Sequence, residues 1–341
     1  MTVPGGLHPV QGDAAELIPL LRDWLDGDEP LWVRTSGSTG RPKDVVLSPR
    51  AVRASATATH ARLGGPGQWL LAVPPSGVAG LQVLVRSLLA GCDPVTDVTA
   101  YDADRRYASL VPTQLHRLLE GAEIAGGGVD AWAALDTVLV GGGPVPADLV
   151  DRAAAAGLTV VRTYGMSETC GGCVYDGVPL DGVQMRVDDT GQVLLAGSVL
   201  FDGYLDAPRT EEWFATADLG EIVDGRLSIR GRVDDVVVSG GVNVPLPAVT
   251  DALQRAEGVG DAFAVGVPDP EWGQVVAALV VPADAVCLDA VQLDRLRDAV
   301  EEAGHPRTWA PRRVVLVDAV PMLPNGKPDR IAARDVAARA S

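Results

Sequence analysis

Residues 35–43 read Thr-Ser-Gly-Ser-Thr-Gly-Arg-Pro-Lys and follow a short apolar segment. Gly37 and Gly40 allow the backbone to turn with its N–H groups exposed, while the side-chain hydroxyl groups add donors and Lys43 adds a positive charge. This composition predicts a loop that holds phosphate groups, although a Ser/Thr/Gly cluster by itself is more often an ordinary loop. The Walker P-loop, in which two glycines separated by four residues precede Lys and Ser or Thr, does not match this spacing.

Three further motifs follow this loop along the chain. Tyr164-Gly-Met-Ser-Glu168 comes after the apolar segment 158–161, Gly231-Arg-Val-Asp-Asp235 comes after another expected strand, and Pro324-Asn-Gly-Lys327 lies close to the C-terminus. The four motifs in this order resemble those of the acyl-adenylate-forming family, which contains acyl- and aryl-CoA ligases, luciferases and the adenylation domains of peptide synthetases. The resemblance implies an α/β and α+β fold with a large N-terminal domain and a small, mobile C-terminal domain.

Length and charge are consistent with such an enzyme. The chain has 341 residues, of which 47% are apolar, so it is long enough for two domains with a sizeable core. Its formal net charge of −17 disfavours a nucleic acid or an anionic membrane as a partner, because the summed field repels phosphates. The sequence lacks both a run of about 18 apolar residues and a basic segment followed by an apolar one, so we expect no membrane span, no signal peptide and a cytoplasmic location.

The four cysteines are too few for a disulfide framework in a chain of this length. Cys170 and Cys173 have the spacing of a redox or zinc pair, but the sequence offers no second ligand pair at a matching interval. We therefore expect structural thiols. Because the pair directly follows Glu168, we also expect it to line a pocket.

Short apolar strands alternate with helical segments through the first two thirds of the chain, for example 68–73 before 78–91 and 137–140 before 146–157. This alternation predicts a mainly parallel sheet flanked by helices. Ser48 followed by Pro49 predicts the start of a helix, with Ser48 as its cap.

From Gly182 the expected strands become short and closely spaced, at 183–187, 192–195 and 226–229, which predicts an antiparallel or barrel-like piece. The segment after residue 235 reads as a strand, a Gly-rich turn, a helix from about 245, two strands, a helix from about 289 and a strand, which is a compact α+β unit. We place the domain boundary at Asp234, so that residues 1–233 form the large domain and residues 234–341 the small one.

The chemistry implied by the resemblance is the attack of a carboxylate on the α-phosphorus of ATP, with pyrophosphate as the leaving group. Such a site must neutralise the phosphates while aligning them. By the resemblance, the β- and γ-phosphates are held by the loop residues Thr35, Ser36, Gly37, Ser38, Thr39, Gly40 and Lys43. Glu168 offers an oxygen ligand for the Mg²⁺ that bridges the phosphates.

The resemblance also assigns the nucleoside. Tyr164, with Gly165 and Ser167 beside it, presents a flat ring that suits an adenine face, although a tyrosine at this position can also be a core residue. Asp218 matches the family aspartate that accepts the ribose hydroxyl groups, and Arg232 matches the arginine that joins it. Either charged residue could otherwise belong to a surface ion pair of little energetic weight.

A second half-reaction, transfer of the acyl group to coenzyme A, is implied for the same site. The family lysine that matches Lys327 enters the site for adenylation and leaves it for thioester formation; the alternative is a solvated tail lysine. Asp234 would be the hinge on which the small domain rotates. Gly240 and Gly241 would border the channel for the pantetheine arm.

Arg86 is the one charged residue in the strongly apolar helical segment 80–91. A buried guanidinium needs a partner, which is either a carboxylate of the chain itself or a second carboxylate on the substrate. The strings 109–115, 141–144, 163–175 and 177–183 resemble the o-succinylbenzoate:CoA ligase family of menaquinone biosynthesis, in its short actinobacterial form. By that resemblance Arg86 binds the aromatic carboxylate of o-succinylbenzoate, and Thr113, Gly142 and Gly143 help to line the acyl pocket.

The sequence departs from the family pattern in three places. The phosphate loop begins near residue 35, so the region that most members place ahead of it is largely missing and the large domain is reduced at its N-terminus. Asp44 stands where a glycine usually follows the lysine, and Ser76-Gly77 lies where a histidine is usual; we expect His60, His116 and His305 to be ordinary surface or partly buried residues that do not replace it. Two alternatives follow: a ligase for a different carboxylic acid, or a weakened homologue that only binds nucleotide or acyl-CoA. A homodimer is compatible with all of these.

Overall fold

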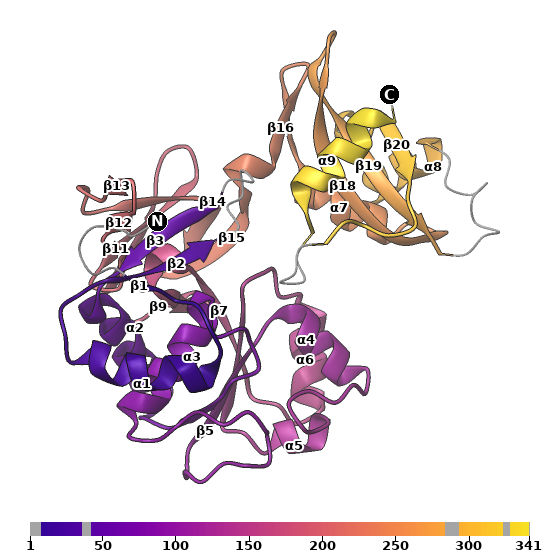
Figure 1. Cartoon of the computed structure of the whole chain (residues 1–341). Coiled ribbons are helices and arrows are strands. Elements are labelled where there is room, and N and C mark those ends of the chain that lie inside the picture. The colour runs from indigo at the N-terminus through magenta and orange to yellow at the C-terminus, as the bar shows by residue number, and fades with distance from the viewer. Residues whose placement is uncertain (1–7, 36–41, 284–292, 323–327, 341) are drawn as a thin grey trace. The chain divides into compact units, whose positions relative to one another are not determined.

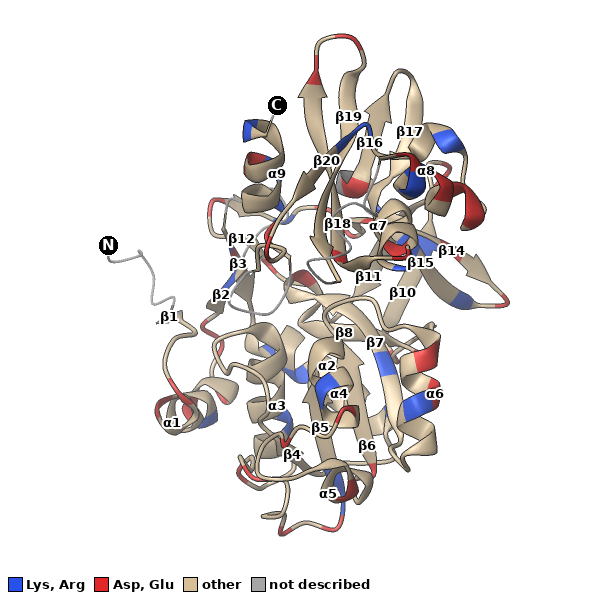
Figure 2. Ribbon diagram, turned by 90° about the vertical axis from the view of Figure 1, so that its right-hand side faces the viewer, with Lys and Arg blue, Asp and Glu red and all other residues tan. Residues whose placement is uncertain are grey.

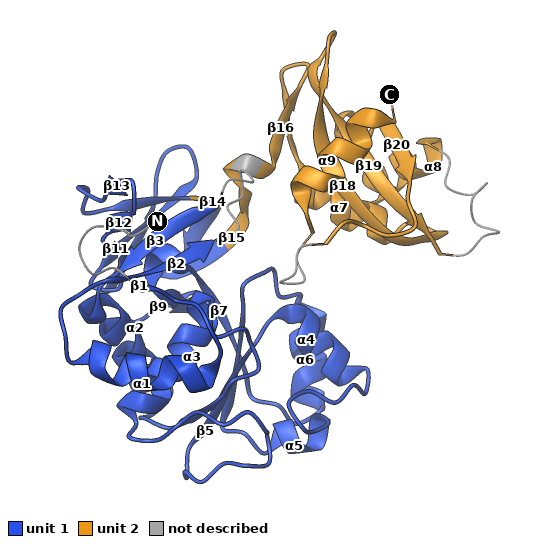
Figure 3. Cartoon of the chain, in the orientation of Figure 1, with its two compact units in different colours: residues 1–37, 42–216, 220–228 blue, residues 38–41, 217–219, 229–341 orange. Residues whose placement is uncertain are grey.

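The computed structural model describes residues 8–35, 42–283, 293–322 and 328–340, which divide into two compact units (Figure 1 and Figure 3). Unit 1 contains the described residues up to 216 together with 220–228, and unit 2 contains 217–219 and the described residues from 229 onward. Asp and Glu occur in elements of both units, including α1 and α8 (Figure 2). None of the helices described is long and apolar enough to cross a membrane. The functional boundary at Asp234 stays a prediction.

Unit 1 begins with a region in which strands and helices alternate. Its elements are β1 (His8–Pro9), α1 (Ala14–Leu25), β2 (Leu31–Thr35), β3 (Lys43–Leu47), α2 (Pro49–Arg62), β4 (Gln68–Leu70), α3 (Val78–Leu89), β5 (Arg106–Leu110), α4 (Pro112–Leu119), α5 (Val129–Ala133), β6 (Thr137–Gly141), α6 (Ala147–Ala155), β7 (Val160–Met166), the 3₁₀ turn η1 (Ser167–Thr169), β8 (Gly171–Tyr175) and β9 (Val178–Pro179).

The largest sheet of unit 1 has the order β4-β5-β6-β7-β8-β9, and its first four strands are parallel. Successive side chains of these strands point to opposite faces, and both faces are buried. Trp69 and Tyr107 face the core formed with α2 and α3, whereas Leu70 and Ala108 face the core formed with α4, α5 and α6. Helices therefore cover both faces of the sheet, as Figure 1 shows and as the sequence pattern predicts.

Two smaller sheets complete this part of the chain. They are built from β1, β2, β3 and the strands β10 (Val183–Val187), β11 (Gln192–Gly197), β12 (Gly203–Tyr204), β13 (Ala207–Pro208), β14 (Phe214–Val223) and β15 (Arg226–Arg232). One has the order β1-β2-β3-β12-β13 and the other the order β10-β11-β14-β15. The closely spaced strands expected after Gly182 are therefore present, and β10 has the predicted bounds.

Unit 2 is an α+β unit around a sheet of order β17-β16-β19-β18, with β20 paired to β19. Its elements are η2 (Val233–Asp235), β16 (Val236–Ser239), β17 (Val242–Pro245), α7 (Leu246–Gln254), β18 (Val259–Asp269), β19 (Gly273–Pro282), α8 (Leu293–Glu302), η4 (Arg307–Trp309), β20 (Arg313–Leu316) and α9 (Arg330–Arg339). Alternate residues of β19 pack into the core with α7 and α8 or into the core with α9. The helix α9 is an addition to the predicted pattern.

Two local expectations are corrected by the structure. Ser48 does precede α2, with Pro49 in the first turn, but its hydroxyl group makes no capping hydrogen bond and instead donates to Asp202 Oδ1 at 3.2 Å. The second is the expectation that Cys170 and Cys173 line a pocket: both thiols are instead fully buried, in two different apolar cores. Burial raises the pKa of Cys173 to about 12, as expected for an inert structural thiol.

Candidate active site

The strands β2 and β3 form the frame of the phosphate loop. Thr35, the last residue of β2, pairs with Lys43, the first residue of β3, and its Oγ1 donates to the Lys43 carbonyl oxygen at 3.3 Å. Residues 36–41 lie outside the described residues, so the roles predicted for Ser36, Gly37, Ser38, Thr39 and Gly40 stay predictions. The structure does establish that both ends of the loop are anchored in one antiparallel strand pair.

The charge of Asp44 is balanced within this strand pair. Arg34 faces Asp44 across the ladder, and its Nε and Nη2 donate to the two carboxylate oxygens at 2.8 and 3.0 Å. Neighbouring residues of a strand point to opposite faces, so Asp44 points away from the face that carries Lys43. The carboxylate therefore does not oppose Lys43, which removes the main objection that the sequence raised against phosphate binding at this loop.

Lys43 and Glu168 are connected through a residue that the sequence did not single out. The ammonium nitrogen of Lys43 lies 4.9 Å from the ring centroid of Tyr204, and the Tyr204 hydroxyl group donates to Glu168 Oε1 at 2.9 Å. Burial, with the nearby charge of Glu168, raises the pKa of Tyr204 above its ordinary value. The two residues predicted for phosphate and metal binding thus contact the same tyrosine side chain, Lys43 at its ring and Glu168 at its hydroxyl group.

Hydrogen bonds to the backbone fix the turn that carries Glu168. The Thr169 hydroxyl group accepts from the Met166 amide at 2.9 Å and donates to the Gly171 carbonyl at 2.7 Å. Cys170 has a left-handed backbone with φ of 51°, and its carbonyl oxygen accepts from Ser55 Oγ at 3.1 Å. Since such a backbone is costly for a residue other than glycine, these bonds are needed to hold the turn.

Tyr164 and Gly165 lie in β7, where this strand and β8 approach closely. Tyr164 is half-buried beside the core of α2 and α3. A Cβ atom on Gly165 would lie 2.0 Å from the Gly171 carbonyl oxygen, and the register shifts at this point. The absence of a side chain at Gly165 is therefore required by the fold, whatever its relation to an adenine ring.

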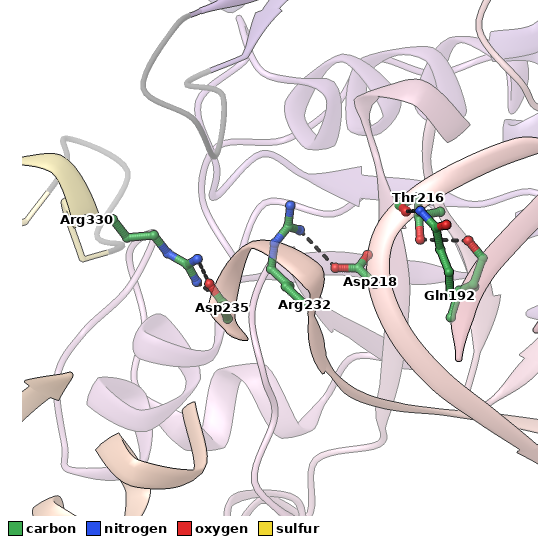
Figure 4. A network of polar contacts seen from close by, with 7 residues as sticks. Gln192, Thr216, Asp218, Arg232, Asp235 and Arg330 are labelled. Carbon is green, nitrogen blue, oxygen red and sulfur yellow. Dashed lines mark hydrogen bonds and ion pairs between the residues drawn. The ribbon is translucent and has the colours of Figure 1, made fainter. Parts of the chain in front are cut away.

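Asp218 and Arg232 are paired, as their motif positions suggested. The side chain of Asp218, in β14, is buried, and Arg232 Nη1 at the end of β15 donates to its Oδ1 at 2.9 Å (Figure 4). Thr216, two residues earlier in β14, is tied to β11 by its hydroxyl group, which donates to the Val193 carbonyl at 2.9 Å, and by its own carbonyl, which accepts from Gln192. These bonds fix β14 to β11 two residues before Asp218.

Arg86 is buried without an ion-pair partner among the described residues. The residue is 3% exposed, and its Nε atom has no hydrogen-bond partner in this part of the chain. The guanidinium carbon lies 4.7 Å from the ring centroid of Trp69, and burial lowers the pKa of Arg86 below its ordinary value. Of the two partners that the sequence left open, a carboxylate of the chain itself is not found among the residues described.

His60 lies next to this cluster and is more buried than the sequence predicted. It is 7% exposed, and its Nε2 accepts a hydrogen bond from Trp69 Nε1 at 3.3 Å. Burial, with a smaller contribution from the charge of Arg86, lowers the pKa of His60 to about 4. A neutral imidazole therefore supports Trp69, which in turn lies against Arg86.

The residues predicted to line the acyl pocket lie beyond the carboxyl ends of the parallel strands, where ligands of such sheets bind. Thr113 belongs to the first turn of α4, after β5, and lines a surface hollow of about 380 Å³. Cβ atoms on Gly142 and Gly143, after β6, would lie 3.7 Å from Val111 and 3.8 Å from Pro112. These three residues are brought together, whereas Arg86 packs with Trp69 on the other face of the sheet.

In unit 2 the backbone conformation of a tight turn explains why Gly240 and Gly241 are glycines. Gly240 and Gly241 form the two-residue turn between β16 and β17, with φ of 56° and 83°, which glycine adopts easily. Asp234 lies in η2, and Lys327 is outside the described residues. Asp235, which follows Asp234, is buried and forms a bidentate ion pair with Arg330 at the start of α9, with Nη2 and Oδ2 2.8 Å apart (Figure 4).

The sheets of unit 1, the α+β unit that follows them and the pairing of Asp218 with Arg232 define the fold of an adenylate-forming enzyme. The chain belongs to the AMP-binding enzyme family: the family profile "AMP-binding enzyme" matches residues 22–205, and the profile "AMP-binding enzyme C-terminal domain" matches residues 248–327.

Curated relatives and solved structures agree with this assignment. The chain is 44% identical over 330 residues to a probable 2-succinylbenzoate--CoA ligase of Mycobacterium tuberculosis, covering 90% of this chain and 84% of the relative. It is 30% identical to the 2-succinylbenzoate--CoA ligase of Enterococcus faecalis, covering 86% of this chain and 66% of that protein. The fold matches the o-succinylbenzoate CoA synthetase MenE of Bacillus subtilis, solved with its acyl-adenylate intermediate, with a TM-score of 0.73, 24% identity and coverage of 89% and 68%.

Proposed function

We propose that this chain is an ATP-dependent ligase that activates o-succinylbenzoate as an acyl adenylate and transfers the acyl group to coenzyme A. The relative with 44% identity carries that activity in its name and is covered over most of its length. Within the molecule, the substrate proposal rests on Arg86, a buried cation with an orphaned Nε atom, and it requires the ring carboxylate to reach the face of the sheet that carries Trp69. A second carboxylate on the substrate would supply the charge that the described residues lack.

In the first half-reaction, a carboxylate oxygen of the succinyl chain bonds to the α-phosphorus, and the bond from this phosphorus to the pyrophosphate oxygen breaks. Lys43 and the loop 35–43 would bind the β- and γ-phosphates, and Tyr164, with Gly165 and Ser167, would hold the adenine. Asp218 would accept the ribose hydroxyl groups. Arg232, already bonded to Asp218 at 2.9 Å, would keep that carboxylate oriented.

The donor set at Glu168 suits a magnesium ion. Its half-buried carboxylate accepts one hydrogen bond, on Oε1, from Tyr204. A carboxylate has several further lone pairs, and Mg²⁺ prefers oxygen ligands of this kind together with substrate phosphates. Bound there, the ion would neutralise charge on the leaving pyrophosphate.

In the second half-reaction, the thiol sulfur of coenzyme A loses its proton and bonds to the acyl carbon, and the bond from this carbon to the phosphate oxygen breaks, so that AMP leaves. We assign Lys327 to adenylation and Asp234 to the hinge between a large domain 1–233 and a small domain 234–341. The Gly240-Gly241 turn would border the thiol channel. Supply of ATP and coenzyme A is consistent with a cytoplasmic enzyme, and a homodimer remains compatible with these assignments.

The decisive experiment measures pyrophosphate release with matched acids. o-Succinylbenzoate is compared with 4-oxo-4-phenylbutanoate, which keeps the succinyl chain and ring but lacks the ring carboxylate. Since leaving a buried charge unpaired costs about 3 kcal/mol, we expect kcat/KM to favour o-succinylbenzoate by roughly 100-fold. Coenzyme A should then give the thioester.

Other outcomes would select the alternatives. Equal use of both acids, or better use of benzoate or a fatty acid, would show that the substrate is a different acid. Binding of ATP by calorimetry without pyrophosphate release on any acid would show a homologue that only binds nucleotide.

A further inference from the structure

We infer that Tyr204 is a positioning residue for Mg²⁺ and ATP, which keeps Lys43 and Glu168 apart and orients both. The inference rests on the proposed function of these two residues. One face of the ring meets the Lys43 ammonium group, with 4.9 Å from nitrogen to ring centroid, and the hydroxyl group at its edge donates to Glu168 Oε1 at 2.9 Å.

A spacer is needed because Lys43 and Glu168 have opposite charges and would otherwise pair directly. Such a pair would occupy the ammonium group intended for phosphate and the carboxylate intended for a metal ion. Neither residue forms an ion pair within the described parts of the chain. The aromatic face attracts the cation while leaving its N–H donors available, and the hydroxyl group uses a single lone pair of the carboxylate.

The backbone holds Tyr204 firmly in this place. It lies in β12, which pairs with β3 so that Tyr204 faces Val45, two residues from Lys43 on the same face of the strand. The preceding Gly203 has φ of 138°, and a Cβ atom there would lie 2.4 Å from the Arg209 amide nitrogen. Phe201 packs edge-on against the Tyr204 ring at 5.1 Å, and its amide donates to the Glu168 carbonyl at 2.9 Å. One short segment therefore fixes both the tyrosine and the turn of Glu168.

The two contacts can be separated by substitution. Tyr204→Phe keeps the ring against Lys43 but removes the hydroxyl group from Glu168, whereas Tyr204→Leu removes both contacts. Tyr101→Phe is the matched control, because it deletes a tyrosine hydroxyl group that donates to the Tyr107 carbonyl at 2.7 Å in a region without a predicted site residue. Folding of each variant is checked by thermal melting.

The readout is binding of α,β-methylene ATP to the full chain by calorimetry across a range of Mg²⁺ concentrations. Loss of a residue that orients a metal ligand weakens metal affinity by about 10- to 100-fold. We expect Tyr204→Phe to raise the Mg²⁺ concentration for half-maximal binding by about tenfold, with nucleotide affinity at saturating Mg²⁺ changed less than about twofold. Tyr204→Leu should weaken both, by about tenfold or more, because Lys43 is then also released.

Three results would overturn the inference. They are an unchanged Mg²⁺ requirement in Tyr204→Phe, equal losses in Tyr204→Phe and Tyr204→Leu, and a similar loss in Tyr101→Phe. If the unsubstituted protein binds no nucleotide at any Mg²⁺ concentration, the proposed function itself fails. The two failures are therefore distinguishable, and neither depends on which acid the enzyme uses.

Discussion

Replacing Arg86 by methionine should stabilise the unliganded protein while removing its preference for a dicarboxylic acid. Arg86 is 3% exposed, its Nε atom has no hydrogen-bond partner among the described residues, and its guanidinium lies over the Trp69 ring. A methionine fills much of the same volume without a charge or a donor. The native residue therefore carries a stability cost that substrate binding would relieve.

The size of the effect follows from two opposing contributions. An unsatisfied buried polar group costs about 1–3 kcal/mol, and exchanging a buried charge for an apolar residue is often stabilising by a similar amount. Loss of the contact with Trp69, at 4.7 Å, removes about 0.5–2 kcal/mol. The net gain should be about 1 kcal/mol, or a rise in Tm of about 2–4 °C for a unit of this size.

Arg62→Met is the matched control, because it makes the same change on a neighbouring helix at a guanidinium that has partners. Arg62 donates to the Val178 and Pro179 carbonyl oxygens at 3.4 and 2.6 Å. Its replacement removes these two hydrogen bonds and should lower Tm. Thermal melting of both variants without ligand gives the comparison, and pyrophosphate release gives the substrate preference. A fall in Tm for Arg86→Met, similar to that of Arg62→Met, would contradict the reasoning, as would an unchanged preference for o-succinylbenzoate.

Three further predictions test other parts of the molecule. Because the pKa of His60 is about 4 in the folded state and about 6.5 in an unfolded chain, its neutral form contributes its full stability above pH 6.5, and the free energy of unfolding should fall by about 3 kcal/mol as the pH drops to 4; in urea titrations His60→Gln should lose this part of the pH dependence. Gly165→Ala should destabilise by about 3 kcal/mol or more because its Cβ would lie 2.0 Å from a carbonyl oxygen, whereas Gly128→Ala, with open space around it, should change Tm little; similar losses would refute the steric argument. Lys327→Ala should abolish adenylate formation but spare thioester formation from supplied adenylate, and equal loss of both would remove its assigned role.

Local patterns in the sequence were enough to predict much of the fold. The strand β10, the alternation of strands and helices around β4 to β7, and the α+β unit after Asp235 are all present, because each is encoded by nearby residues. The proximity of Asp218 to Arg232 also followed, since both sit on adjacent strands of one sheet.

The sequence did not reveal contacts that depend on how strands pair and how helices pack on the sheets. Tyr204 reaches Lys43 only because β12 joins β3 across about 160 residues of chain. The pairing of Arg34 with Asp44 depends on the register of β2 against β3, which the composition of the loop between them does not specify. The burial of His60 depends on α2 packing against the sheet that carries Trp69, and its helical position alone gives no sign of it.

The ion pair between Asp235 and Arg330 has a consequence for protein engineering. It joins the residue directly after the proposed hinge to the helix that begins three positions after Lys327. If the backbone turns at Asp234, this ion pair makes the segment at Asp235 and the start of α9 move together. A transplant of this domain into a relative should therefore take both residues from one parent, because a graft that separates them would leave the buried carboxylate of Asp235 without its counter-ion.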